Sequence, residues 1–228
     1  MIKFLNIKKQ FNNKNIFKDF SLNIQEGEFI CITGKSGTGK TTLFDILIGK
    51  EKIDSGKVYI DDIDISSLKT HQIQIYRRKL GIVFQDFKLL LKKTVFENLA
   101  FVLEACGEDE KKIFSKVKKV LSIVNLEEKI AQFPSNLSGG EKQRVAIARA
   151  LIHDPKIILA DEPTGNLDRE NTKMILDILR YINKEFKVTI ILTTHDPFVI
   201  EYLNSRVVLI KNGESIFNGK ASDYILEK

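Results

Sequence analysis

The chain has 228 residues, a hydrophobic fraction of 43% and a formal net charge of +6, which suits one substantial core or one α/β domain with a smaller subdomain. No apolar run approaches the ~18 residues of a membrane-spanning helix, and the polar start of the chain is not that of a signal peptide, so we expect a cytosolic protein that reaches a membrane only through a partner. The charge does not indicate nucleic-acid binding, because the lysines are dispersed among 30 acidic residues and cluster at the spacing of solvated helix faces.

Four short apolar runs predict the strands of an α/β core. They are too short for helices and nearly continuous rather than alternating, which is typical of parallel strands that are buried on both faces. Helical patterns at residues 41–48 and 171–184 lie between them. The predicted strands are residues 29–33, 81–84, 157–160 and 189–194.

Three further regions do not follow this alternation. The opening segment and residues 58–60 predict antiparallel strands that lie on the core, and residues 206–219 predict a hairpin around Asn212 and Gly213. Residues from about 86 to 153 are mostly helical in pattern. We interpret them as an inserted helical subdomain of a single domain that spans residues 1–228.

A glycine-rich segment directly follows the first predicted core strand. It reads GKSGTGKT and satisfies the G-x-x-x-x-G-K-[ST] phosphate-loop pattern between a strand and a helix, which is the context that the pattern requires. Its glycines allow backbone N–H groups to surround phosphates, Lys40 supplies a charge to the β and γ phosphates, and the Thr41 hydroxyl is placed to bind Mg²⁺. A plain glycine-rich turn is the alternative. The residues expected to bind ATP here are Gly34, Lys35, Ser36, Gly37, Thr38, Gly39, Lys40, Thr41 and Thr42.

Polar residues follow each of the other predicted core strands, namely Gln85, then Asp161 with Glu162, then His195. The carboxyl ends of parallel strands form the edge where open α/β sheets bind ligands. We therefore expect Asp161 to hold Mg²⁺ and Glu162 to orient or deprotonate the water that attacks the γ-phosphate. His195 is expected to bond the γ-phosphate or that water, and Gln85 to reach both the metal and the water. Taken alone, such a histidine or glutamine is more often structural.

The sequence NLSGGEKQR, residues 136–144, predicts a helix start of unusual composition. Ser138 and Glu141 form an S-x-x-E capping box, yet Gly139 and Gly140 each destabilise a helix by about 1 kcal/mol relative to alanine. Two glycines at a helix N-terminus let an anion approach bare amides at the positive end of the dipole. Because the phosphate loop already serves its own nucleotide, we expect Ser138, Gly139 and Gly140 to meet the γ-phosphate of a second copy in an ATP-dependent two-fold dimer.

Together with the LSGGE motif, these segments resemble the ATP-binding cassette (ABC) ATPases over nearly the whole chain. The resemblance implies an α/β fold of the P-loop NTPase (RecA-like) type, in which a parallel-sheet core carries an antiparallel β subdomain and an inserted α-helical subdomain. It makes Gln85 the Q-loop residue, residues 166–168 the D-loop and His195 the switch histidine. Members of the family also place an aromatic residue upstream of the phosphate loop to stack on adenine, and Phe11 occupies that place; the alternative is a packing residue at a strand end.

Within this family, residues 76–90 and 93–107 are similar to the FtsE branch, whose members work with the membrane protein FtsX in cell division and control of cell-wall hydrolases. The resemblance implies an ATPase on the cytoplasmic side of the cell membrane with an integral FtsX-like partner. The run of Phe87, Leu89, Leu90 and Leu91 is expected to dock that partner, unless these residues belong to the core.

Three other functions remain as alternatives. The segment LADEPTGNLD is also shared by the LolD and MacB ATPases of lipoprotein release and macrolide export, which lack the Asp86 and Phe87 pair. A DNA- or ribosome-associated ABC ATPase is disfavoured, because the short distance between the phosphate loop and the LSGGE motif leaves no room for a long coiled coil. A module that binds ATP without hydrolysis is disfavoured by Glu162.

Overall fold

The predicted core strands form the centre of a six-stranded sheet in the computed structural model, which describes residues 1–12 and 14–226. The strand order is β10-β9-β3-β8-β7-β6, parallel from β9 to β6, with β10 antiparallel at one edge. The predicted parallel α/β core is therefore confirmed. The strands are β3 (Phe29–Thr33), β6 (Leu80–Val83), β7 (Ile157–Asp161), β8 (Thr189–Thr193), β9 (Arg206–Lys211) and β10 (Glu214–Lys220).

Both faces of this sheet are buried, as the continuous apolar runs predict. Successive side chains of a strand point to opposite faces. In β3, Ile30 and Ile32 belong to one hydrophobic cluster, whereas Cys31 belongs to the other. In β7, Leu159 belongs to the cluster of Ile30, and Ala160 to that of Cys31.

An antiparallel sheet of order β2-β1-β4-β5 packs with helix α1 over the first of these faces. Its strands confirm the antiparallel layer that the opening segment and residues 58–60 predict. The hairpin around Asn212 and Gly213 is also confirmed, but it belongs to the main sheet, because β9 pairs in parallel with β3. The elements of this side are β1 (Ile2–Phe11), β2 (Lys14–Ile24), α1 (Lys40–Leu47), β4 (Ser55–Ile60), β5 (Ile63–Asp64), the 3-10 helix η1 (Ile65–Ser67) and α2 (Thr70–Arg77).

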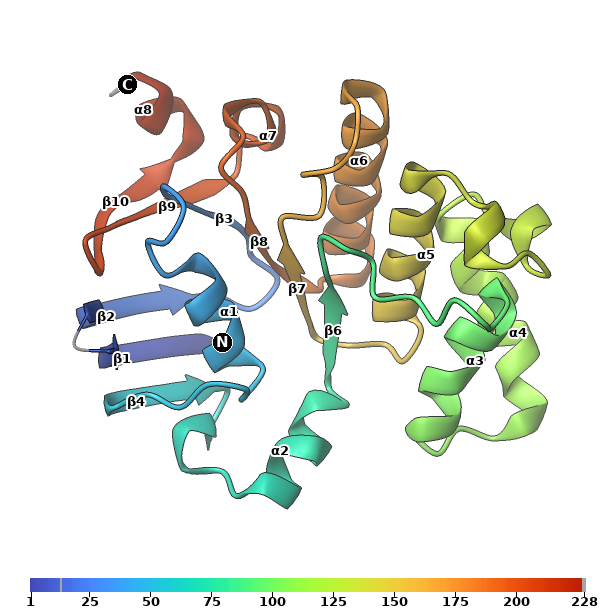
Figure 1. Cartoon of the computed structure of the whole chain (residues 1–228), viewed down its shortest axis with the longest axis horizontal. Helices are drawn as coiled ribbons and strands as arrows, with labels where there is room; N and C mark the ends of the chain where they lie inside the picture. The colour runs from blue at the N-terminus through green and yellow to red at the C-terminus, as the bar shows by residue number, and fades with distance from the viewer. Residues whose placement is uncertain (13, 227–228) are drawn as a thin grey trace.

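Helices cover the second face of the main sheet. Figure 1 shows α5 and α6 beside β7 and β6, with α3 and α4 farther out on the side opposite the antiparallel strands. The α5 helix lies directly on the sheet, because a Cβ atom on Gly81 of β6 would lie 2.4 Å from the carbonyl oxygen of Ala150. The helices are α3 (Val95–Ala105), α4 (Glu110–Ile123), η2 (Glu127–Lys129), η3 (Pro134–Asn136), α5 (Gly139–Leu151), α6 (Arg169–Phe186), α7 (Pro197–Leu203) and α8 (Ala221–Leu226).

The helices of the described residues are short or amphipathic. In α6, the longest of them, the predicted apolar positions Ile175, Ile178, Leu179 and Ile182 are buried, as an apolar stripe at helical spacing requires. None of the helices within residues 1–12 and 14–226 is both long enough and apolar enough to cross a membrane.

Candidate functional site

The phosphate-loop residues connect β3 to α1. The loop packs against β2 at one glycine and has open space around another. A Cβ atom on Gly39 would lie 2.9 Å from Cγ2 of Ile16 and 3.0 Å from Cζ of Phe17, both in β2. Gly37, at a φ of +76°, has open space around the corresponding position. The loop therefore rests against β2 at Gly39 and exposes its backbone at Gly37, where only a glycine adopts this conformation without strain.

The Lys40 ammonium group lies inside the curve of this loop. It donates to the carbonyl oxygens of Gly34, at 2.8 Å, and Lys35, at 3.2 Å, and only 7% of the residue is exposed. The Thr38 hydroxyl donates to the same Lys35 oxygen at 2.8 Å. A buried cation is thus held by the loop in the place where the phosphate-loop pattern requires it. The exposed residues of the predicted loop are Lys35, Ser36, Gly37 and Thr41, and Thr42 is half-buried.

The carboxyl group that ends β7 is fixed by the neighbouring strand. The Thr193 hydroxyl donates to Oδ1 of Asp161 at 2.6 Å and accepts from the backbone N–H of Glu162 at 3.0 Å. Burial raises the pKa of Asp161, and the bond from Thr193 opposes that rise. The motif reading did not include Thr193, although polar threonines at the end of an otherwise apolar strand were a visible signal.

Glu162 adopts a left-handed backbone conformation, with a φ of 44°. A residue with a Cβ atom is strained there by about 1–2 kcal/mol. Oε2 of its carboxylate lies 3.0 Å from Nδ1 of His195, and the two side chains are 20% and 65% exposed. The turn after β7 and the loop after β8 thus bring together two residues that the sequence assigns to the attack on the γ-phosphate.

One cavity of about 800 Å³ joins the phosphate loop to this pair, a volume within the range of small-molecule sites. Lys40, Glu162 and His195 line it together. Residues of the β9–β10 hairpin and Tyr224 of α8 also line it, and the sequence motifs did not include them. The remaining residues of the lining are Thr33, Gly34, Lys35, Ser36, Thr38, Leu209, Ile210, Lys211, Asn212 and Ile216.

Gln85 follows β6 and lies beside the turn that follows β7. Its side-chain Nε2 would be 2.9 Å from a Cβ atom on Gly165, and its backbone oxygen accepts a long bond of 3.5 Å from Nδ2 of Asn166. The exposed Gln85 side chain is therefore near residues 161–166, as expected for the shared edge of the sheet.

The segment after Gln85 is held by two helices. Arg149 of α5 donates to the carbonyl oxygens of Phe87 and Lys88, whose φ values are 61° and 48°, and burial lowers the pKa of its guanidinium. Asn98 of α3, which is fully buried, accepts from the Leu90 N–H at 2.8 Å and donates to the Leu90 oxygen at 3.1 Å. The segment after Gln85 is therefore bonded to both α3 and α5.

The predicted capping box at the start of α5 is confirmed. The Ser138 hydroxyl accepts from the Glu141 N–H at 3.2 Å, and Oε2 of Glu141 accepts from the Ser138 N–H at 2.8 Å. Ser138 and Gly139 are exposed. Neither residue is part of the described lining of the 800 Å³ cavity that the phosphate loop shares with Glu162 and His195.

Gly140 has a packing role that the sequence reasoning did not foresee. It is buried, and a Cβ atom on it would lie 2.1 Å from Oδ1 of Asn171 in α6. The Asn171 amide cannot turn freely, because its Nδ2 donates to Oδ2 of Asp168 at 2.8 Å and its backbone N–H donates to Oδ1 at the same distance. Access for an anion is thus not the only reason for a glycine at position 140, whereas Gly139 has ordinary space.

This contact predicts opposite effects of one substitution in two backgrounds. In the native chain, we expect Gly140→Ala to lower the free energy of unfolding by about 1 kcal/mol, because the steric overlap exceeds the gain in helix propensity. In an Asn171→Ala background the overlaps with Oδ1 and Cγ are removed and only a contact of 3.3 Å with the Cβ atom of residue 171 remains. A shift of a few tenths of an ångström accommodates that contact, so the same substitution should raise that free energy by up to about 1 kcal/mol. Urea unfolding measures both values, with Gly139→Ala as the matched control. The same change in both backgrounds would contradict the packing role.

Phe11 lies at the end of β1, paired with Lys14 of β2. Its ring is 40% exposed and is not part of the described cavity lining. The hairpin that carries it touches the phosphate loop, because Ile16 and Phe17 pack on Gly39. The ring therefore lies on the strand pair that contacts the loop, with surface available for a flat ligand.

Comparisons with known proteins agree with this geometry. The ABC transporter family matches residues 17–165. The chain is 41% identical over 218 residues to the cell division ATP-binding protein FtsE of Streptococcus pneumoniae (strain D39), covering 96% of this chain and 94% of that protein. It is 42% identical over 226 residues to the methionine import ATP-binding protein MetN of Clostridioides difficile, covering 99% of this chain and 70% of that protein.

A solved structure gives the same result for the fold. A dimeric ATP-binding cassette in a post-hydrolysis state, bound to ADP and Pi, matches with a TM-score of 0.86 and 36% identity over 97% of this chain and 99% of that chain. The parallel core, the phosphate loop on β3 and the cavity between Lys40 and Glu162 are thus found in a chain that matches ATP-binding cassettes over nearly its full length. The chain belongs to the ABC transporter family and is an ATPase with the P-loop NTPase fold.

Proposed function

We propose that this ATPase is the FtsE-type subunit of a membrane complex in bacterial cell division, held at the cytoplasmic side of the cell membrane by an integral FtsX-like partner. The observation that carries the ATPase chemistry is the cavity shared by Lys40, Glu162 and His195. The cell-division role is supported by 41% identity to an FtsE protein over nearly all of both chains, and by Asp86 and Phe87 after Gln85.

In this proposal the phosphate loop, residues 34–42, binds the triphosphate through its backbone N–H groups, and Lys40 neutralises part of the phosphate charge. Asp161, Thr41 and Gln85 would hold Mg²⁺, which would offset the negative charge that phosphoryl transfer concentrates on the phosphate oxygens. The donors suit this ion, because Mg²⁺ prefers oxygen ligands, and the bond from Thr193 to Asp161 fixes the orientation of one of them.

Glu162 orients the attacking water or accepts its proton, and His195 holds the Glu162 carboxylate from the opposite loop at 3.0 Å. Because phosphoryl transfer needs mainly positioning and charge neutralisation, a carboxylate held at a fixed place is the main contribution of the protein at this point. Phe11 stacks on the adenine base, a contact worth ~1–3 kcal/mol.

We further propose that Ser138, Gly139 and Gly140 bind the γ-phosphate held by a second copy, so that ATP joins two chains and hydrolysis releases them. The position of Ser138 and Gly139 outside the cavity of their own chain supports this arrangement, as does the dimeric state of the similar cassette. Residues 86–153 act as the helical subdomain that presents this helix N-terminus to the other chain.

A second candidate function is the ATPase of a transporter, either of the LolD or MacB type or similar to the MetN importers. The 42% identity to a MetN protein favours it as strongly as the match to FtsE favours cell division. The test is to purify the tagged chain from membranes of the organism that encodes it and identify the integral membrane protein by mass spectrometry. An FtsX-like protein is expected. A substrate-translocating permease instead would overturn the cell-division role.

The partner surface is narrower than the run of four apolar residues suggested. Leu89 is half-buried and packs against the core, whereas Leu90 and Leu91 are 38% and 69% exposed. Phe87 is half-buried, with its carbonyl oxygen held by Arg149. We therefore place the docking surface at Leu90 and Leu91, beside the segment that α3 and α5 hold.

We expect Leu91→Asp to abolish co-purification with the membrane partner and to leave the basal ATPase rate of the isolated chain within about twofold of the native rate, because an exposed anchor contributes to binding and not to folding. The matched control is Ile75→Asp, since Ile75 is 59% exposed on α2. Pull-down and ATPase assays on the same preparations measure both properties. Intact co-purification of the Leu91 variant would refute docking at this position.

A further inference from the structure

The side chain of Lys9 is an unusual feature of the antiparallel sheet. Only 7% of the residue is exposed, and its ammonium nitrogen lies 4.6 Å from the centroid of the Phe11 ring. A cation at this distance over an aromatic face is attracted by the quadrupole of the ring. The ring that we assign to the adenine base therefore has an ammonium group against one of its faces.

The ammonium group of Lys9 is fixed from its other side by the segment that follows α1. It donates to the carbonyl oxygen of Lys52 at 2.7 Å and forms ion pairs with Glu51 at 3.1 Å and Asp54 at 4.0 Å. Asp54 also accepts from the backbone N–H of Gln10 at 2.7 Å. These bonds hold a buried charge in one place, as its burial requires.

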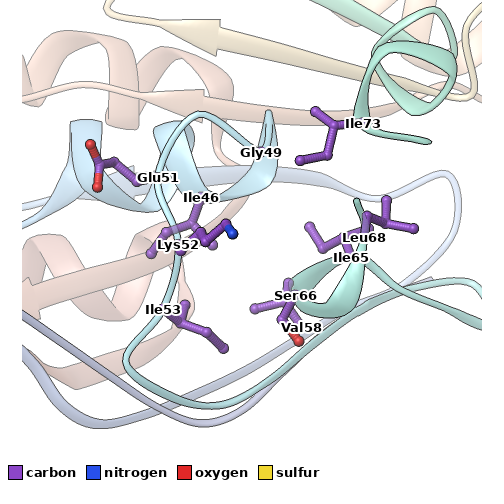
Figure 2. Close-up of a pocket in the computed structure, with 10 residues that line it drawn as sticks. All are labelled: Ile46, Gly49, Glu51, Lys52, Ile53, Val58, Ile65, Ser66, Leu68 and Ile73. Atoms are coloured by element: carbon purple, nitrogen blue, oxygen red, sulfur yellow. The ribbon is translucent and has the colours of Figure 1, made fainter. Parts of the chain in front are cut away.

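The segment itself is anchored to the helix that follows the phosphate loop. The Glu51 N–H donates to the Asp45 carbonyl oxygen of α1 at 3.1 Å. Ile46 and Ile53 line a small pocket beside this segment, and Figure 2 shows the Glu51 carboxylate directed away from it. This pocket of about 20 Å³ has room for only about one water molecule, so it is too small to bind a nucleotide base.

We infer that Lys9 is a positioning residue for nucleotide binding: it holds the Phe11 ring from one face, so that the base stacks on the opposite face. The inference rests on the proposed stacking of adenine on Phe11. The contacts of Glu51 and Lys9 connect α1, which begins at the phosphate-binding Lys40, to the base-binding ring. A ring held in one orientation loses less conformational entropy when the base binds.

The chain contains no tryptophan, so Phe11→Trp introduces a single tryptophan, whose fluorescence reports on this position. We expect MgATP to quench this reporter and inorganic tripolyphosphate, which has no base, to bind without quenching it. Adding Lys9→Met should weaken MgATP binding by roughly threefold to tenfold and leave tripolyphosphate affinity, measured by calorimetry, unchanged. The matched control is Lys8→Met, on the exposed neighbour in β1, which should change neither affinity.

The possible failures are distinguishable. Absence of quenching by saturating MgATP would overturn the stacking on Phe11, and the role of Lys9 with it. Quenching with unchanged MgATP affinity in the Lys9 variant would overturn the positioning role alone, as would an equal loss of MgATP and tripolyphosphate binding, because Lys9 would then support the phosphate loop. If Lys9→Met does not fold, Glu51→Gln replaces it, since Glu51 is partly exposed. It should weaken MgATP binding selectively, and unchanged affinity would again overturn the positioning role.

Discussion

Glu162→Gln should lower the ATP turnover rate by at least about 100-fold, the range of a lost general base, while MgATP binding remains. The amide has the same shape as the carboxylate and can still accept a bond from His195, so the 3.0 Å contact between the two side chains is preserved. The variant side chain can no longer accept a proton from the attacking water or align that water. Lys40 and Asp161 are unchanged, so a stable ATP-bound dimer should accumulate.

A phosphate-release assay measures the turnover, and size-exclusion chromatography with MgATP detects the dimer. The matched control is Glu185→Gln, on an exposed position of α6, which should retain the native rate. Turnover of the Glu162 variant near the native rate would show that this carboxylate is not the group that activates the water.

Lys40→Ala should weaken MgATP binding by about 10- to 100-fold, because a hydrogen bond to a charged group is worth ~1.5–3 kcal/mol. The ammonium group bonds two carbonyl oxygens of its own loop. The variant leaves these oxygens without that donor, so a small loss of thermal stability should accompany the loss of binding. The two effects can be measured separately, because the loss of thermal stability is measured in samples to which no nucleotide is added.

Calorimetric titration with MgATP gives the affinity of this variant. Lys50→Ala is the matched control, since Lys50 lies just beyond the other end of α1 and is exposed; it should bind MgATP with native affinity. Native affinity in the Lys40 variant would contradict the assignment of the phosphate loop.

The features that could be predicted from the sequence are those that local pattern determines. Continuous apolar runs of four to six residues identified four core strands, because a parallel strand buried on both faces has no polar alternation. The phosphate loop, the capping box at Ser138 and the hairpin at Asn212 depend on residues close in sequence, so spacing alone specifies them. The shared strand edge then brought Glu162 near His195, as the structure shows.

Contacts between distant segments could not be predicted in the same way. Arg149 bonds the Phe87 carbonyl oxygen across 62 positions, and the Lys9 ammonium group reaches the Lys52 oxygen across 43. No motif or residue pattern in the sequence indicates that either pair of residues is in contact. Gly140 is an example with two separate requirements for a glycine. One is access of an anion to the N-terminus of α5, which the sequence indicates. The other is the close approach of Asn171, which the sequence does not indicate.

The measurement that most directly tests the shared site uses two different chains. One carries Glu162→Gln and binds ATP; the other carries Lys40→Ala with Ser138→Cys and supplies a thiol, with the ATP probe kept at a concentration too low to occupy its weakened phosphate loop. A thiol-reactive group on the γ-phosphate of ATP should label the second chain, because its α5 N-terminus meets the nucleotide of the first. The control replaces the second chain by one that carries Lys40→Ala alone. This control chain retains the exposed Cys106 and therefore measures the background labelling. Labelling above this background is the predicted result, and labelling equal to it in dimers of the two chains would contradict a site built from both.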